Sequence, residues 1–92
     1  MKYELQYTSD FENDKEKLRK FGEIKALQKL AKLLIELTEH PTTGTGKPKP
    51  LSGDRLSQWS RRITKKHRLI YLIEEKRVVV LLLSAYGHYD DK

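Results

Sequence analysis

Between residues 59 and 85 the chain reads WSRRITKKHRLIYLIEEKRVVVLLLSA. Apolar and polar residues alternate through the first part of this stretch, which is the period of half-buried strands. The residues on one side of the alternation are Trp59, Arg61, Ile63, Leu69, Tyr71 and Ile73. Residues 78–85 are apolar almost throughout and are expected to form a strand buried on both faces. Polar turns, at Lys65-Lys66 and at residues 74–77, join these runs, so the sequence predicts an antiparallel meander of three strands.

Two amphipathic helices are predicted before this stretch. The second ends before Pro41 and is marked by apolar residues at intervals of three and four. These residues are Ile24, Leu27, Leu30, Ala31, Leu34 and Leu37. The first helix begins near Asp10, because Ser9 and Glu12 have the spacing of a capping box. Gly22 separates the two helices, and the inner face of the first is expected to carry Phe11, Leu18 and Phe21.

A further strand is predicted at the N-terminus, where Tyr3, Leu5 and Tyr7 alternate with polar residues. The element order is then β-α-α-β-β-β, an α+β fold. We expect one domain over residues 1–92, since a chain of this length has room for one core. The two helices are expected to pack on one face of a small, twisted, mainly antiparallel sheet, which leaves the other face as a working surface.

Cysteine is absent from the chain, which excludes disulfides, thiolate nucleophiles and zinc-thiolate sites. The N-terminal residues MKYELQYTSD lack the apolar core of a secretory signal. The longest apolar run, residues 78–83, is far shorter than the roughly 20 residues of a membrane-spanning helix. We therefore expect a soluble, cytoplasmic protein with no membrane partner. His40, His67 and His88 have no metal-ligand spacing, so no metal or other cofactor is expected.

The positive charge of the chain is concentrated in one segment. The formal net charge is +6, yet residues 47–77 contain ten Lys/Arg and three Asp/Glu, a balance of +7. This basic segment covers the first two meander strands and the loop before them. A basic segment on an otherwise neutral protein is typical of a polyanion partner, which is either nucleic acid or an acidic protein.

The loop GTGKPKPLSG, residues 44–53, includes GTGK, which resembles part of a phosphate-binding loop. The Walker pattern requires glycine at the position of Pro41 and Ser or Thr at the position of Pro48, so an NTPase is excluded. The prolines on either side of Lys49 favour an extended backbone, which would project Lys47 and Lys49 from the surface. A plain solvated connector is the alternative interpretation.

Candidate chemistry lies on the predicted hairpin and at the C-terminus. If the chain turns near Lys65-Lys66, Arg62 and Arg68 are able to bind one anion together. A solvated charged face is the alternative. The C-terminal YGHYDDK contains His88, and an unperturbed histidine has a pKa of about 6.5, which allows it to shuttle protons near neutral pH. The aromatic residue after it can stack on a base. The alternative for this histidine is a structural role.

The motifs GKPKPL, WSRRITKKHRLIY and YGHY follow one another between residues 44 and 89. They resemble the YoeB/Txe branch of the RelE/ParE toxin superfamily, whose members carry G-K-P-E-P-L, W-S-R-R-I, H-R-L-V-Y and a terminal H-Y. The strand-helix-helix order before these motifs also agrees. The resemblance implies a RelE-like fold and the toxin of a toxin-antitoxin pair, a ribosome-dependent endoribonuclease that cuts messenger RNA without a metal.

The resemblance also implies site residues. In that family the 2′-hydroxyl attacks the adjacent phosphorus, a base removes its proton, and an acid protonates the departing 5′-oxygen. The phosphate-stabilising arginine falls on Arg68, the general acid on His88 and the substrate-positioning tyrosine on Tyr89. An accessory arginine falls on Arg62. The basic residues expected to contact RNA are Lys47, Arg61, Arg62, Lys65 and Lys66.

Lys49 departs from the family pattern, which has a glutamate base at this position. An unperturbed lysine, with a pKa of about 10.4, is free base in only about one part in 2,500 at pH 7, a deficit of roughly 4.6 kcal/mol. General-base help provides roughly 3 to 5 kcal/mol, so an unshifted lysine cancels most or all of it. Three outcomes follow. Neighbouring cations depress the pKa of Lys49 and make it the base, or it stays charged and stabilises the phosphate, or cleavage is lost and binding remains.

The resemblance implies partners as well. We expect a cognate antitoxin similar to YefM or Axe, whose acidic segment covers the basic surface, and a ribosome carrying messenger RNA. Operator DNA is expected to be bound only through the antitoxin complex, and a homodimer is a further expectation. Two alternative functions remain: a non-catalytic RNA- or antitoxin-binding module, and a ParE-like gyrase inhibitor.

Overall fold

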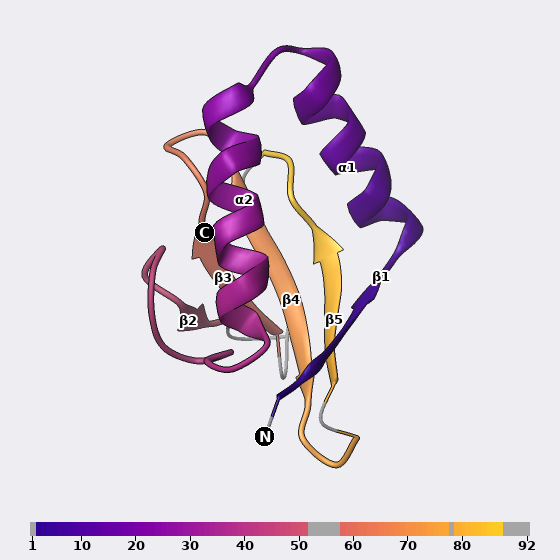
Figure 1. Cartoon of the computed structure of the whole chain (residues 1–92), viewed down its shortest axis with the longest axis vertical. Helices are drawn as coiled ribbons and strands as arrows, with labels where there is room; N and C mark the ends of the chain where they lie inside the picture. The colour runs from indigo at the N-terminus through magenta and orange to yellow at the C-terminus, as the bar shows by residue number, and fades with distance from the viewer. Residues whose placement is uncertain (1, 52–57, 78, 88–92) are drawn as a thin grey trace.

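The computed structural model describes residues 2–51, 58–77 and 79–87 (Figure 1). Its elements are β1 (Glu4–Tyr7), α1 (Ser9–Lys20), α2 (Ile24–Leu37), β2 (Lys49–Pro50), β3 (Gln58–Arg62), β4 (Arg68–Glu74) and β5 (Val79–Ser84). The strands form one sheet in the order β1-β5-β4-β3-β2, with β1 parallel to β5 and the other neighbours antiparallel. The α+β fold and the β3-β4-β5 meander are confirmed. A short strand, β2, forms where the sequence predicted only a loop. Neither helix within the described ranges could cross a membrane.

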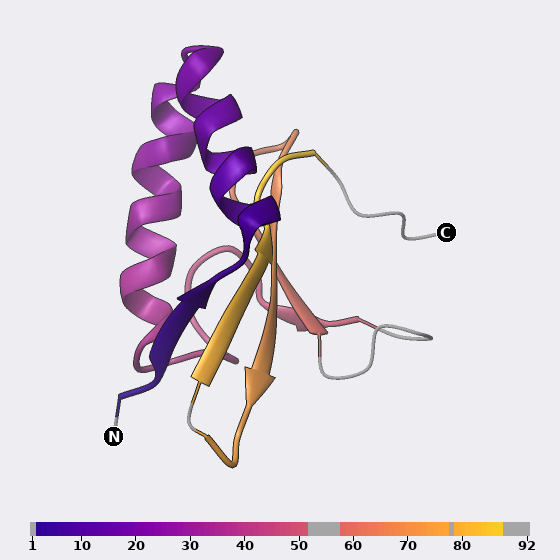
Figure 2. The ribbon, with the colours of Figure 1, turned by 90° about the vertical axis from the view of Figure 1, so that its right-hand side faces the viewer.

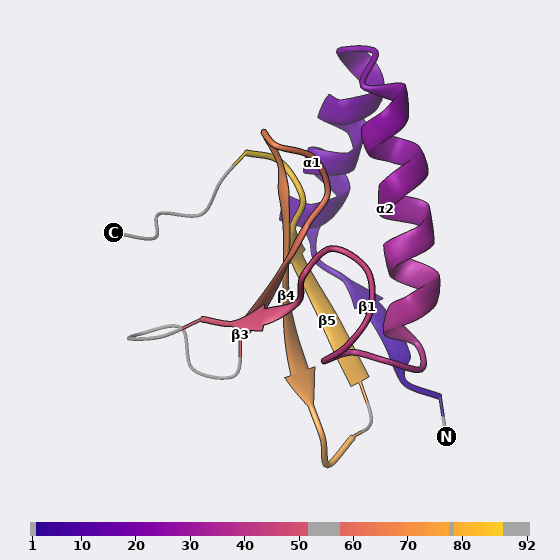
Figure 3. The same cartoon turned by 90° about the vertical axis from the view of Figure 1, so that its left-hand side faces the viewer.

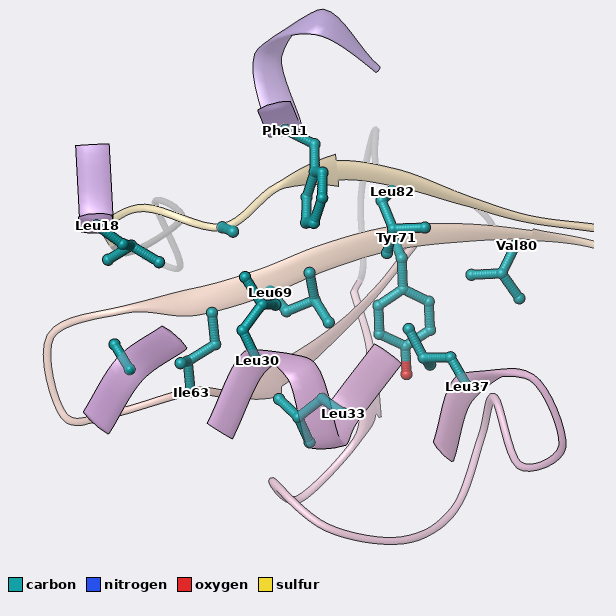
Figure 4. Packing of buried hydrophobic residues seen from close by; sticks show 12 residues of the cluster. Phe11, Leu18, Leu30, Leu33, Leu37, Ile63, Leu69, Tyr71, Val80 and Leu82 are labelled. Atoms are coloured by element: carbon teal, nitrogen blue, oxygen red, sulfur yellow. The ribbon is translucent and has the colours of Figure 1, made fainter. Parts of the chain in front are cut away.

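Both helices pack on the same face of the sheet, as Figures 2 and 3 show from opposite sides. Apolar side chains from the helices and the inner sheet face form one core between the two layers (Figure 4). Its buried members are Phe11, Leu18, Ala26, Leu30, Leu33, Leu37, Ile63, Leu69, Tyr71, Val80, Leu82 and Ala85. Trp59 is partly buried and packs against this core. The predicted two-layer arrangement is therefore confirmed. No helix among the described residues covers the opposite side of β3 and β4, which we call the open face, although Ser60 and Ile70 on that side are buried.

The start of α1 differs from the prediction by one residue. Thr8 is the N-cap, because its Oγ1 accepts a hydrogen bond from the Phe11 amide at 3.1 Å. The same hydroxyl donates to the Leu82 carbonyl of β5 at 2.8 Å, so the cap also joins the helix to the sheet. The Ser9–Glu12 capping box is wrong, since this tertiary contact selects the preceding threonine.

The predicted bounds of α2 are confirmed, but its buried face is rotated. Ala26 and Leu33 are buried, whereas Ile24 and Ala31, predicted on the inner face, are exposed. The helix packs on α1 as well as on the sheet, so two neighbours decide which side chains are covered. Phe21 was also expected inside, but it lies beyond the last residue of α1 and is 60% exposed.

Candidate functional site

The predicted proximity of Arg62 and Arg68 follows from the register of β3 and β4. The two residues are direct partners across the antiparallel pair. Their neighbours Ile63 and Leu69 point into the core on the helix side. Because side chains alternate along a strand and direct partners share a side, Arg62 and Arg68 lie together on the open face. Arg62 is exposed and Arg68 is half-buried.

This arginine pair is arranged for an anion. Like charges directly opposite each other destabilise a strand pair. Among the described residues neither guanidinium forms an ion pair with a carboxylate. Nη1 of Arg68 donates to the carbonyls of the hairpin turn, those of Thr64 at 2.8 Å, His67 at 3.2 Å and Lys65 at 3.4 Å. The turn therefore holds this guanidinium in place, and the pair is suited to bidentate contact with a phosphate.

Lys49 reaches the same face from the neighbouring strand. It is the direct partner of Ser60, which lies two residues before Arg62 and therefore shares its side of β3. Lys49, Arg62 and Arg68 thus lie on one face of three consecutive strands. Lys47 and Lys49 are both exposed. The predicted extended backbone is present at Lys49 and Pro50, which form an edge strand paired to β3, but it is wrong for Lys47, whose φ of +52° is left-handed. The alternative interpretation, a plain solvated connector, is wrong for residues 49–50, because these residues pair with β3.

Arg61, predicted to contact RNA, is buried on the helix side of the sheet. Its exposed fraction is 0%, and its guanidinium makes five hydrogen bonds, as many as it has N–H donors. The acceptors are the hydroxyl of Tyr71 (3.1 Å), the carboxylate of Glu36 (3.1 Å) and the carbonyls of Thr43 (2.7 Å), Thr45 (3.3 Å) and His40. The Tyr71 hydroxyl in turn donates to the Pro41 carbonyl at 2.7 Å. We call this group the arginine clamp and no longer count Arg61 among the residues that face RNA.

The two glycines of GTGK pack closely against residues of the arginine clamp and of β3. Gly46 has φ +87°, and a Cβ on it would lie 2.8 Å from the carbonyl oxygen of Arg62. Its own carbonyl accepts a hydrogen bond from the Arg62 amide at 2.6 Å. A Cβ on Gly44, which has φ +114°, would lie still closer to the carboxylate of Glu36. Close packing against β3 and α2 therefore explains the glycines without a bound phosphate.

The arginine clamp fixes the charge of its members. Hydrogen bonds from Thr45 hold the pKa of Glu36 below its ordinary value, and the charge of Arg61 acts in the same direction against the effect of burial. Burial raises the pKa of Tyr71, and Arg61 opposes that rise. Near neutral pH the clamp therefore contains a guanidinium, a carboxylate and a neutral phenol, which are the states that its hydrogen bonds require.

His67 is buried between two distant segments. Its Nδ1 accepts a hydrogen bond from the Gly87 amide at 2.8 Å, and its Nε2 lies 3.1 Å from Oε2 of Glu23. The Arg68 amide donates to the Gly87 carbonyl at 2.9 Å. The sequence does not reveal these contacts, because their partners are 44 and 20 residues away and no local motif marks them.

The remaining predicted site residues are placed less fully. His88 and Tyr89 lie outside the described residues. Lys65 and Lys66 are exposed at the predicted hairpin turn, and the Lys66 ammonium lies 3.3 Å from the Glu23 carboxylate. Across the described ranges, no group of three or more His, Cys, Asp or Glu side chains is arranged to hold a metal ion.

Comparisons with known proteins agree with this geometry. The profile of the YoeB-like toxin of bacterial type II toxin-antitoxin systems matches residues 7–89. Toxin RelK of Mycobacterium tuberculosis is 38% identical over 65 residues, which are 71% of this chain and 74% of RelK. The solved YoeB/ParE toxin from Agrobacterium tumefaciens is 30% identical with a TM-score of 0.85, and the match covers 94% of this chain and 99% of that one.

A more distant structure shares the fold. It is the heterotetrameric YoeB-YefM toxin-antitoxin complex from Staphylococcus aureus, where the match is 23% identical with a TM-score of 0.78 and covers 97% of this chain and 100% of that one. At this identity the likeness is one of fold alone. The family profile and the mycobacterial relative carry the assignment, and the predicted resemblance is confirmed. The chain belongs to the YoeB-like toxins of bacterial type II toxin-antitoxin systems.

Proposed function

We propose that this protein is a ribosome-dependent endoribonuclease that cuts messenger RNA in the cytoplasm and so inhibits translation. The observation that carries the proposal is the Arg62–Arg68 pair, which lies on the open face of the sheet with Lys49 on the adjoining strand. Two arginines at opposed strand positions, neither ion-paired with a carboxylate among the described residues, suit the extra negative charge of a pentacoordinate phosphate. Membership of a toxin family supports the same function.

The proposed reaction needs no metal. The 2′-hydroxyl oxygen forms a bond to the adjacent phosphorus and loses its proton to a base, while the bond from phosphorus to the 5′-oxygen breaks. His88 donates a proton to the departing 5′-oxygen, and Tyr89 positions the substrate. Arg68 and Arg62 stabilise the charge on the non-bridging oxygens. The products are a 2′,3′-cyclic phosphate and a free 5′-hydroxyl.

Lys49 is proposed either as the base or as a third cation at the phosphate. Lys49→Arg separates the two roles, because arginine keeps the charge and does not deprotonate. A base role predicts that this variant loses about 10² to 10⁴-fold in rate, whereas a charge role predicts a rate close to wild type. Lys49→Glu restores the family base and is expected to keep or raise the cleavage rate, and Lys49→Ala is expected to lower it.

Lys47, Lys65 and Lys66 are proposed to hold the RNA backbone beside this site. All three are exposed on the basic segment. Contacts of this kind release counterions, so the logarithm of affinity for single-stranded RNA falls with the logarithm of salt by about 0.7 per phosphate contacted. An affinity that does not respond to salt contradicts this assignment.

The direct test is to map messenger-RNA ends on translating ribosomes with wild-type protein, Arg68→Ala and His88→Ala. Wild type is expected to cut, and loss of the charge at Arg68 is expected to slow cleavage by about 10² to 10³-fold. His88→Ala is expected to lose about 10² to 10⁴-fold, the usual value of a general acid. Full toxicity in both variants contradicts catalysis. Ribosome binding by wild type without messenger-RNA cuts supports a non-catalytic binding module. Growth arrest accompanied by loss of gyrase activity supports the ParE-like alternative.

We also propose an acidic antitoxin as the partner of the basic segment. Charge complementarity supports this, as does membership of a family of toxins from toxin-antitoxin systems. Operator DNA is then bound through the antitoxin complex, and a homodimer remains an expectation. Arg62→Glu reverses a charge on the open face and is expected to weaken antitoxin binding in a titration. An unchanged affinity contradicts this location of the antitoxin.

A further inference from the structure

We propose that His67 is a positioning residue, which anchors the chain end after β5 through the Gly87 amide and acts as the neutral tautomer protonated on Nε2. The expected effect of this anchor on the cleavage rate rests on the proposed endonuclease function, because the residue after Gly87 is His88, the proposed general acid. The anchor itself is a property of the described structure and is testable without cleavage.

Both the amide and the carbonyl of Gly87 form hydrogen bonds. Its amide donates to Nδ1 of His67 at 2.8 Å, and its carbonyl accepts from the Arg68 amide at 2.9 Å. The ring of the preceding Tyr86 lies 4.6 Å from the His67 ring, centroid to centroid. β5 ends at Ser84, so these contacts extend the attachment to β4 beyond the strand itself.

The hydrogen bonds assign the tautomer of His67. A backbone amide only donates, so Nδ1 of His67 has to be the unprotonated acceptor. A neutral imidazole carries one proton, which is then on Nε2 and is donated to the Glu23 carboxylate at 3.1 Å. This hydrogen bond holds the pKa of Glu23 below its ordinary value, and Lys66 adds to the effect. Glu23 therefore fixes the proton on the ring nitrogen that faces away from Gly87.

The anchor stands one peptide unit from His88. The side chain of His67 is only 4% exposed, so water does not readily replace its acceptor when that acceptor is lost. A displacement of about 1 Å at a catalytic group can cost about 10²-fold in rate. Loss of the Nδ1 acceptor is therefore expected to slow the chemical step, while the basic residues that bind RNA are unchanged.

Two substitutions separate the two nitrogens of the ring. In His67→Asn the amide oxygen takes the place of Nδ1 and keeps an acceptor for Gly87. In His67→Gln the amide nitrogen takes the place of Nε2, which keeps a donor for Glu23 and removes the acceptor. We expect His67→Gln to lose about 10 to 10²-fold in single-turnover cleavage with ribosome affinity unchanged, and His67→Asn to stay within about threefold of wild type.

A nitrogen-15 NMR experiment on the same proteins tests the anchor independently of cleavage. Wild type is expected to show His67 protonated on Nε2 and a Gly87 amide protected from hydrogen exchange. This protection should persist in His67→Asn and be lost in His67→Gln. Protonation on Nδ1 at neutral pH, or an unprotected Gly87 amide in wild type, overturns the inference. Equal cleavage by the two variants overturns its kinetic part. If wild type does not cut, the proposed function fails, and the NMR result still decides the anchor.

Discussion

Arg61 and Arg62 are consecutive residues of one strand with opposite surroundings. Arg61 is buried under α2 with five hydrogen bonds, whereas Arg62 is exposed on the open face opposite Arg68. Residue type and local charge are the same for both. The pleat of the strand alone decides which arginine supports the fold and which is available to a ligand.

The two sides of the strand also differ in what a lost side chain leaves behind. On the helix side, removal of the Arg61 guanidinium leaves a carboxylate and several carbonyls without their donor, and buried polar groups without partners are costly. On the open side, removal of the Arg62 guanidinium leaves no such buried group among the described residues without a partner, and it removes one of two like charges at opposed strand positions. Stability and chemistry should therefore respond to different arginines.

The largest expected effect on stability is that of Arg61→Ala. Loss of one partner from a buried ion pair costs about 3 to 5 kcal/mol, and we expect the lower end because the Glu36 side chain is 22% exposed. Urea denaturation measures this free energy of unfolding. Arg62→Ala is the matched control and is expected to stay within about 0.5 kcal/mol of wild type. Equal losses in the two variants would remove the distinction between the two sides.

A smaller loss of stability is expected for Gly46→Ala, which tests how closely the loop packs beside the arginine clamp. The Cβ would meet the Arg62 carbonyl oxygen at 2.8 Å, in addition to the cost of a left-handed backbone at φ +87°. Gly22→Ala is the control, because Gly22 has φ +70° with nothing within 4 Å of its Cβ position. We expect Gly22→Ala to cost about 1 to 2 kcal/mol and Gly46→Ala clearly more. A melting experiment in which both variants lose the same stability contradicts close packing at Gly46.

The smallest expected effect is the pH dependence of the arginine clamp. The pKa of Glu36 is lowered on folding from its ordinary value of 4.5, so the ionised side chain contributes stability above that pH. This contribution is lost as the pH falls through the lower, folded-state pKa. Between about pH 5 and pH 3 wild type should therefore lose more stability than Glu36→Gln. Glu39→Gln, at an exposed position, is the control. If the free energies of unfolding of wild type and Glu36→Gln fall in parallel as the pH falls, the stabilising role of ionised Glu36 is contradicted.

The position of Arg61 was readable from the sequence, although its role was not. The alternation at residues 59–63 already placed it on the same side as Trp59 and Ile63, which is the helix side in the structure. Its charge nevertheless argued for the surface. The acceptors that make burial possible come from residues 36–45 and from Tyr71, and a local pattern does not reveal such distant partners.

The same limit separates the correct predictions from the others. The bounds of α2, the meander and the pairing of Arg62 with Arg68 depend on local periodicity and on a short turn, and they are confirmed. Thr8 as the cap of α1, the strand β2 and the bridge from His67 to Glu23 depend on residues far away in the chain. Tertiary contacts chose among local options there, and the sequence shows the options without the choice.

The most direct test of the division between the two sides is single-turnover cleavage of messenger RNA on pre-assembled translating ribosomes by wild type and Arg62→Ala. The free energy of unfolding should be measured on the same samples. We predict a cleavage rate reduced by about 10²-fold with unchanged stability, because the proposed role of Arg62 is to stabilise the phosphate and not the fold. Cleavage by Arg62→Ala at the wild-type rate would contradict the account.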